Sequence, residues 1–164
     1  MLQNVIRRIF KLIGILIGIL ITGFIVLFFV IPFFQKPQLL NIPDLAKWTG
    51  FSDGKYTISY NEESGFLVEG DDSQFLYQLQ SSPIPVSIFP KTYIFNLPII
   101  VHQGNVAVGV LNSSLRNWII PANELRDEYV FKNKFNSSVT IIIANYNLQP
   151  TGNLPSRFTI LKPE

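Results

Sequence analysis

The sequence has no cysteine and a single histidine, His102, among its 164 residues. Without cysteine the chain has no thiol nucleophile, no disulfide and no Cys-ligated zinc or iron–sulfur centre. One histidine does not make a His-rich metal site, and the sequence contains no G-x-S-x-G nucleophile elbow. His102 stands beside the turn Gln103-Gly104-Asn105, where we expect a solvated surface residue. These absences predict a protein that is not an enzyme and that uses no cofactor.

A concentrated cationic surface is also missing beyond the N-terminus. Arg7, Arg8 and Lys11 precede the first apolar run, in a stretch without any acid. The remainder of the chain has ten of the 13 Lys and Arg residues against all 11 Asp and Glu, a net charge of −1. A nucleic-acid-binding domain needs a cationic face to neutralise phosphates. Nucleic acid is therefore not expected among the partners.

Residues 12–34 carry no charge, and Thr22 has their only hydrogen-bonding side chain. With a rise of about 1.5 Å per residue, this run would form a helix of roughly 35 Å, which exceeds the ~30 Å hydrocarbon core of a bilayer. Bulky residues and proline fill Ile31–Phe34, where a cleavable signal peptide needs small residues. The pattern therefore predicts an uncleaved signal-anchor that crosses the membrane once.

The positive-inside bias gives this helix a direction. Arg7, Arg8 and Lys11 outweigh the cations that follow the helix, which predicts a cytoplasmic N-terminus and a periplasmic or extracellular C-terminal domain. The expected organisation is a cytoplasmic basic tail (1–11), a transmembrane helix (12–34), a juxtamembrane connector with a short helix over 42–50 (35–54), and one domain (55–164).

Small residues recur every four positions in the apolar run, at Gly14, Gly18 and Thr22. Residues at this spacing share one face of a helix, and small side chains let a second transmembrane helix approach closely. The partner would be another membrane protein or a second copy of the chain. The alternative is that glycine is simply common in transmembrane helices.

Trp48 in the connector has two interpretations. An amphipathic ring is favoured at the bilayer surface, where Trp48 would lie with Leu39, Leu40 and Leu45. Equally, the ring would fit as a cap on the core of the following domain.

From residue 55 onward the pattern is that of short strands. Tyr56, Ile58 and Tyr60 alternate with polar residues, and other runs are β-branched or aromatic, at 75–79, 93–95, 99–101, 106–111, 139–144 and 158–161. Glycine, proline and aspartate turns separate them. One helical segment is expected over 121–129. This spacing predicts an all-β domain, an antiparallel β-sandwich of jelly-roll type, behind one N-terminal transmembrane helix.

The order of motifs resembles a known family. Gly104-Asn105-Val106-Ala107-Val108-Gly109-Val110-Leu111 is followed by Trp118 and by a closing strand Phe158-Thr159-Ile160. This resembles the galactose-binding-like jelly rolls of discoidin-type and carbohydrate-binding modules, over about residues 54–162. The resemblance implies the jelly-roll fold and a sugar-binding role. It also implies a structural calcium near the turn with Glu69, Asp71 and Asp72; the alternative is an ordinary solvated turn.

Four large aromatic residues are candidates for contact with a saccharide: Trp118, Tyr93, Tyr129 and Tyr146. Flat aromatic faces pack against the apolar faces of sugar rings, so together they would form a stacking platform. Large aromatics in a β-sandwich are, however, usually core residues. The pattern around Trp118 does not fix the side on which it lies.

These observations predict a membrane-anchored, non-enzymatic binding or accessory subunit. Its partners would be the bilayer, another envelope protein or a second copy, and a saccharide. The alternative is a bridging component of a lipid or polysaccharide export system, because proteins of lipopolysaccharide export resemble this layout. That function requires a continuous apolar groove or an open sheet edge.

Overall fold

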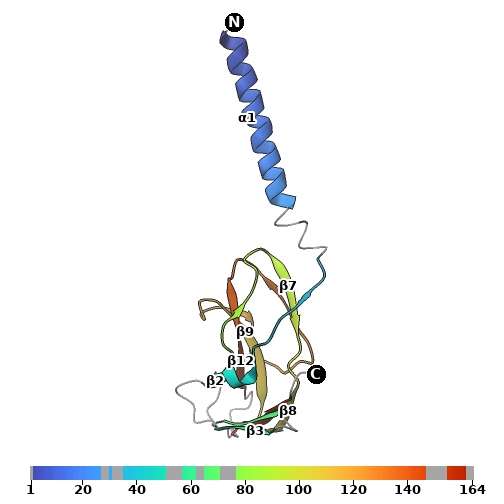
Figure 1. The fold of residues 1–164 in the computed structure, drawn as a ribbon, viewed down its shortest axis with the longest axis vertical. Coiled ribbons are helices and arrows are strands. Elements are labelled where there is room, and N and C mark those ends of the chain that lie inside the picture. The colour runs from blue at the N-terminus through green and yellow to red at the C-terminus, as the bar shows by residue number, and fades with distance from the viewer. Residues whose placement is uncertain are drawn as a thin grey trace. The chain divides into compact units, whose positions relative to one another are not determined.

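The computed structural model describes residues 2–26, 30, 35–50, 57–61, 65–70, 77–146 and 155–161. The chain forms two compact units, residues 1–36 and 37–164 (Figure 1). The first contains one apolar helix, and the second is built of several mainly antiparallel β-sheets.

The helix α1 (Leu2–Ile25) contains the segment Ile6–Ile25, which is long and apolar enough to cross a membrane. Its 20 residues correspond to about 30 Å at 1.5 Å per residue. The helix begins before residue 12, so the cations expected in a separate tail are part of it. Nothing in residues 2–11 breaks a helix, which explains the earlier start. Residues 27–29 and 31–34 of the expected span lie outside the described residues.

The described strands of the second unit pair into three sheets. Sheet A has the order β1 (Gln38–Leu39), β7 (Lys91–Phe95), β11 (Tyr129–Asn133), with β1 parallel to β7. Sheet B has the order β10 (Trp118–Ile120), β9 (Val106–Asn112), β12 (Ser138–Asn145), β5 (Tyr77–Gln80), β2 (Thr49–Gly50), and β6 (Ile84–Pro85) also pairs with β12. Sheet C has the order β3 (Thr57–Asn61), β4 (Gly65–Glu69), β13 (Arg157–Ile160), β8 (Ile99–Gln103).

Strand β12 is central to sheet B. It pairs with β9 along one edge and with β5 and β6 along the other, and every residue from Val139 to Asn145 is buried. Val139, Ile141 and Ile143 belong to the hydrophobic core. Because strand side chains alternate, the residues between them face the opposite side of the sheet. The β-branched run suits a strand that is covered on both faces.

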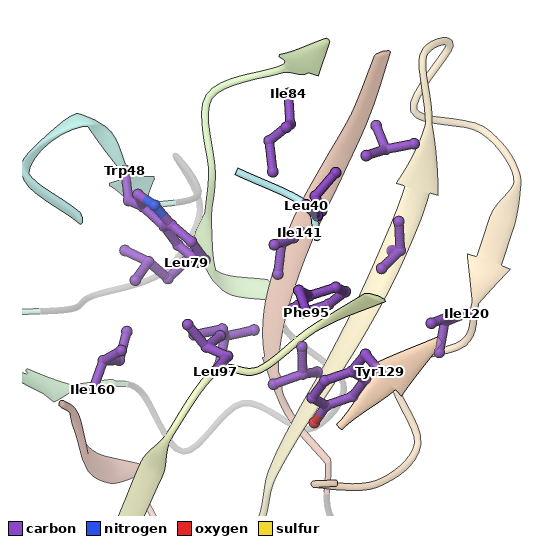
Figure 2. Packing of buried hydrophobic residues seen from close by; sticks show 14 of the residues in the cluster. Leu40, Trp48, Leu79, Ile84, Phe95, Leu97, Ile120, Tyr129, Ile141 and Ile160 are labelled. Carbon is purple, nitrogen blue, oxygen red and sulfur yellow. The ribbon is translucent and has the colours of Figure 1, made fainter. Parts of the chain in front are cut away.

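Sheet A contributes stacked aromatic rings to the same core. Tyr129 is paired with Phe95 and Phe131 with Tyr93, and the ring centroids are 4.9 Å and 5.6 Å apart. Figure 2 shows Phe95 and Tyr129 in this cluster. Each buried phenol has a partner, because Tyr129 Oη accepts from the Arg126 N–H and Tyr93 Oη from the Ser87 N–H. The rings are thus fixed both by packing and by hydrogen bonds at the edge of the core.

The strand pattern read from the sequence is confirmed for the segments that the structure describes. The expected runs correspond to β3, β5, β7, β8, β9, β12 and β13. The turn between β8 and β9 is also confirmed, since Gly104 has the left-handed φ of 75° that favours glycine. The short strands β1, β2 and β6 and the strands β4, β10 and β11 were not predicted.

Of the two helices expected, one is present in a shorter form and one is absent. Within 42–50 the 3₁₀ helix η2 (Leu45–Lys47) forms, and it ends there because Trp48 turns into the core and Thr49 joins sheet B. Over 121–129 no helix forms; the Glu124 carbonyl accepts from the Val108 N–H, and Tyr129 starts β11.

Trp48 caps the core and does not lie on the surface. Its side chain is 5% exposed and belongs to the core cluster, into which it points in Figure 2. Its indole N–H donates to the Pro43 carbonyl at 3.2 Å. Of the two interpretations of this residue, the core cap is therefore the one that the structure supports.

A serine hydroxyl bridges the break between β5 and β6. Both strands lie along the same edge of β12, and Ser81 lies in the gap between them. The Ser81 N–H donates to the Ile141 carbonyl at 2.9 Å, and Ser81 Oγ accepts from the Ile141 N–H at 3.0 Å. In the gap between β5 and β6 the hydroxyl thus takes the place of a strand carbonyl as the acceptor of the Ile141 N–H.

Ser81→Ala tests this bridge. It leaves the buried Ile141 N–H without its acceptor, so we expect the free energy of unfolding to fall by about 1–3 kcal/mol. The measurement is denaturant unfolding of the full chain in detergent. Ser82→Ala, at the neighbouring half-buried serine, is the control and should change stability by less than about 0.5 kcal/mol. Equal losses in the two variants would contradict the bridge.

Candidate functional site

An aromatic-walled hollow of about 380 Å³ lies on sheet B. It is formed by strands β5, β10 and β12 and by the segments that follow β10 and β12. Its lining residues are Tyr77, Trp118, Pro121, Ala122, Asn123, Ala144 and Tyr146. We call it the aromatic hollow. Three rings around a cavity of this size fit a small, partly apolar ligand.

Small residues make room for the large rings. Ala144, opposite Tyr77 in the β5–β12 pairing, lines the hollow, and Gly109 lies under the Trp118 ring. A Cβ added at Gly109 would be 2.5 Å from Trp118 Cζ3 and 2.8 Å from the Ile120 carbonyl oxygen. Since real Cβ atoms do not approach so closely, only glycine allows the ring to lie at this height over the sheet.

Tyr77 and Trp118 form one wall as an aromatic pair. Their ring centroids are 5.6 Å apart and the ring planes meet at 81°, an edge-to-face contact. Burial raises the pKa of the Tyr77 phenol above its ordinary value, so it stays neutral at physiological pH. The Trp118 side chain is 38% exposed and therefore offers part of its ring to a ligand.

The four aromatic residues expected to form one platform divide into two pairs. Trp118 and Tyr146 line the aromatic hollow together. Tyr93 and Tyr129 are buried in the core and are not among the residues that line the aromatic hollow, so the four residues do not form one platform. Tyr93 stacks on Phe131 and Tyr129 on Phe95 because β7 pairs with β11. This pairing cannot be predicted from the residue types alone.

Tyr77 is the site residue that the sequence interpretation missed. It lies in a strand that was predicted, but its position in the hollow depends on the pairing of β5 with β12. Alternation alone gives two possible faces for such a tyrosine. The face with the hollow becomes clear only from the residues that line it with Tyr77, namely the small Ala144 opposite it on β12 and Trp118 on β10.

The remaining predicted sites are placed as follows. Glu69 forms an ion pair with Arg157 at 3.1 Å, while Asp71 and Asp72 of the expected calcium turn lie outside the described residues. Among the residues that the structure does describe, no cluster of three or more His, Asp or Glu side chains is arranged to hold a metal. His102 is exposed on β8, with Nε2 2.8 Å from Thr159 Oγ1.

The small-residue face of α1 is open within the described part of the chain. A Cβ added at Gly14 or at Gly18 would have no atom of another element within 4 Å, and Thr22 is exposed on the same helix. The face therefore has space for a second helix, and the expected helix–helix contact stays a prediction.

A second, more apolar hollow lies elsewhere in the domain. It has a volume of about 670 Å³ and is bounded by η2, by the segment between β7 and β8, by β4 and by the residue after β13. We call it the apolar hollow. Its lining residues are Ile42, Pro43, Asp44, Leu45, Ala46, Phe66, Asn96, Leu97, Pro98 and Leu161.

Comparison of the chain with protein-family models, with curated proteins and with solved structures gave no match. The resemblance to galactose-binding-like jelly rolls is therefore carried by the sequence motifs alone.

Gly109→Ala tests how the Trp118 ring is held. The added methyl group must displace the ring and the backbone at residues 120–122, so we expect the free energy of unfolding to fall by about 1–3 kcal/mol. Tryptophan emission should shift as Trp118 moves, since Trp48 stays buried. Ala107→Gly, on the same strand, is the control: it should lower stability without shifting the emission. An unshifted spectrum in Gly109→Ala would contradict the seating of Trp118 on Gly109.

Proposed function

We propose that the chain is a single-pass, non-enzymatic binding subunit whose β domain takes a saccharide into the aromatic hollow. In this proposal the N-terminus is cytoplasmic and the domain is periplasmic or extracellular. The cations of α1 support the orientation, because Arg7, Arg8 and Lys11 lie at its N-terminal end. The shared core of sheets A and B supports a jelly-roll-like sandwich as the fold of the domain.

The observation that carries the proposal is the convergence of Tyr77, Trp118 and Tyr146 around one cavity. Sugar rings have apolar C–H faces and polar edges. Exposed aromatic faces bury the former, and polar groups at the rim hydrogen-bond to the latter. Asn123, whose side chain has both donors and an acceptor, supplies such a rim group. The near-neutral domain suits an uncharged ligand of this kind.

Tryptophan emission provides a direct test. The full chain in mild detergent is titrated with neutral α- and β-linked glucose and galactose oligosaccharides. We expect a change in emission from the half-exposed Trp118, whereas the buried Trp48 serves as an internal reference. Trp118→Phe should abolish the signal. Trp118→Ala should weaken binding, followed by calorimetry, roughly tenfold or more, as for an aromatic residue at the centre of an interface.

Two controls make the result decisive. Tyr93→Phe changes an aromatic residue of the core and should leave affinity unchanged. Binding of every oligosaccharide with the same affinity to Trp118→Ala and to the parent would rule out the aromatic hollow as the site. No binding by the parent to any member of the series would count against the saccharide proposal itself.

The apolar hollow favours a second candidate, the bridging component of a lipid or polysaccharide export system. Its volume of about 670 Å³ falls in the ~300–1,000 Å³ range typical of ligand pockets. The lining is mainly aliphatic, with Phe66 as its ring, and suits an acyl chain better than a sugar. The residue Asp44 is the only acid in the lining and Lys and Arg are absent from it, so a lipid phosphate has no cationic partner among these residues.

Leu161→Trp separates the two candidates. The larger side chain should fill the apolar hollow and abolish binding of a dansyl-labelled fatty acid to the full chain, while Leu161→Met should retain it. Trp118→Ala, in the other hollow, should leave fatty-acid binding unchanged. Equal fatty-acid binding by the parent and Leu161→Trp would exclude the apolar hollow as a lipid site.

A further inference from the structure

Three loops at one end of the β domain each carry exposed, large apolar side chains. They connect β6 to β7 (residues 86–90), β9 to β10 (113–117) and β11 to β12 (134–137). The exposed residues on them are Ile88, Phe89, Leu115 and Phe135. We call these four residues the apolar tip.

The strand register shows that the three loops share one end. In sheet B, Val139 at the start of β12 is level with Asn112 at the end of β9 and with Ile84 of β6. In sheet A, Lys91 at the start of β7 is level with Asn133 at the end of β11. Hydrogen bonds join the loops as well: the Val86 N–H donates to the Ser137 carbonyl. The Asn133 side-chain amide donates to the Ser87 carbonyl.

Neither burial nor backbone conformation explains why large apolar residues occupy positions 115 and 135 of the tip. Leu115 and Phe135 are 53% and 68% exposed, and both have left-handed backbone conformations, with φ of 57° and 63°. Glycine or asparagine adopts this conformation at lower cost, whereas bulky side chains rarely do. Exposed apolar residues in such a conformation indicate a contact made outside the chain.

Cations flank the tip, and the three loops that form it, all within the described residues, contain no acid. Lys91, Arg116, Lys132 and Lys134 flank or lie on the same loops and strand ends. The sequence contains no Asp or Glu from residue 73 to 123 or from 129 to 163, so every charged side chain on these loops and the adjoining strand ends is a cation. The acidic segment 124–128 precedes Tyr129 and therefore lies at the opposite end of sheet A. This end of the domain complements an anionic surface.

The polypeptide also enters the domain at this end. Strand β1 runs parallel to β7, with Gln38 level with Tyr93, so Pro37 precedes β1 on the side where β7 begins. Pro37, the first residue of the domain, therefore lies at the end of sheet A that carries the apolar tip. A surface with apolar side chains, a cationic surround and a covalent connection to a membrane-spanning helix fits the interface of a bilayer.

We propose that the apolar tip docks on the surface of the bilayer that α1 spans, with the four apolar side chains among the lipid acyl chains and the cations at anionic headgroups. The proposal rests on α1 as the membrane anchor and requires no ligand in either hollow. Because the helix already holds the domain at the bilayer, docking requires no search in solution and a small apolar area suffices.

The test uses the full chain in liposomes. Since the protein has no cysteine, Leu115→Cys and Phe135→Cys each provide a unique site for a nitrobenzoxadiazole label, and Asp127→Cys labels the opposite end of sheet A as a control. The vesicles contain phosphatidylcholine and phosphatidylglycerol, with a trace of acyl-chain spin-labelled lipid as quencher. We expect the labels at 115 and 135 to be quenched severalfold more than the label at 127.

Each result has a distinct meaning. If the chain fails to float with the vesicles, α1 is not a membrane anchor. Chain that floats, but whose labels at 115, 135 and 127 are quenched equally, would overturn the docking proposal alone. A blue-shifted label at 115 or 135 that lipid does not quench would also overturn it, because a protein surface would then cover the tip.

Charge reversal tests the cationic surround. One Lys or Arg near an anionic bilayer changes the docking equilibrium by a factor of about five. Arg116→Glu combined with Lys134→Glu should therefore lower the docking equilibrium constant more than 20-fold. Lipid quenching of the labels at 115 and 135 should then fall to about that of the control label at 127. In vesicles of phosphatidylcholine alone, the double variant and the parent should be quenched equally. Unchanged quenching of the double variant in anionic vesicles would contradict the headgroup contacts.

Discussion

The burial of β12 on both faces is the constraint on which the rest of the domain depends. One set of its side chains, Val139, Ile141 and Ile143, holds the core that sheets A and B share. The alternate set faces outward and includes Ala144, which lines the aromatic hollow. A single strand thereby sets both the stability of the domain and the position of its candidate site. The alternate set also contains the β-branched Thr140 and Ile142, and only Ala144 is small enough to leave room for the hollow.

How far sequence predicts this domain depends on how local the decisive contacts are. β9 and β12 were predicted because their β-branched runs are continuous, and α1 because an apolar run of that length has few other structures available. Tyr129 was assigned to a helix because Pro121 and Glu124 precede it, yet pairing with Phe95, 34 positions earlier, makes it a strand residue. Trp48 and Trp118 were undecided for the same reason.

The aromatic hollow could not be predicted from the sequence either, because it depends on contacts between distant residues. Tyr77, Trp118 and Tyr146 are far apart in the sequence, and the residues that bring them together are distinguished by what they lack. Gly109 has no side chain where the Trp118 ring lies, and Ala144 has only a methyl group. A pattern of large apolar residues identifies a core. It does not identify a cavity, whose shape depends on small residues in neighbouring strands.

The two proposals about the domain constrain each other through the direction of its strands. The apolar tip lies beyond Val139. Trp118, at the near edge of the aromatic hollow, is level with Leu111, next to the end of β9 at the tip, whereas Ala144, at the far edge, is five residues from Val139 along β12, or about 17 Å at ~3.3 Å per residue. A domain that docks by its tip therefore directs the Ala144 end of the hollow away from the bilayer, where soluble ligands reach it. The apolar hollow includes Asn96–Pro98, beyond the end of β7 farthest from the tip, so it too would face away. An acyl chain would then have to reach it from a partner protein, whereas a saccharide would reach the aromatic hollow from solution. Docking at the tip thus favours the saccharide over the lipid as the ligand of this domain.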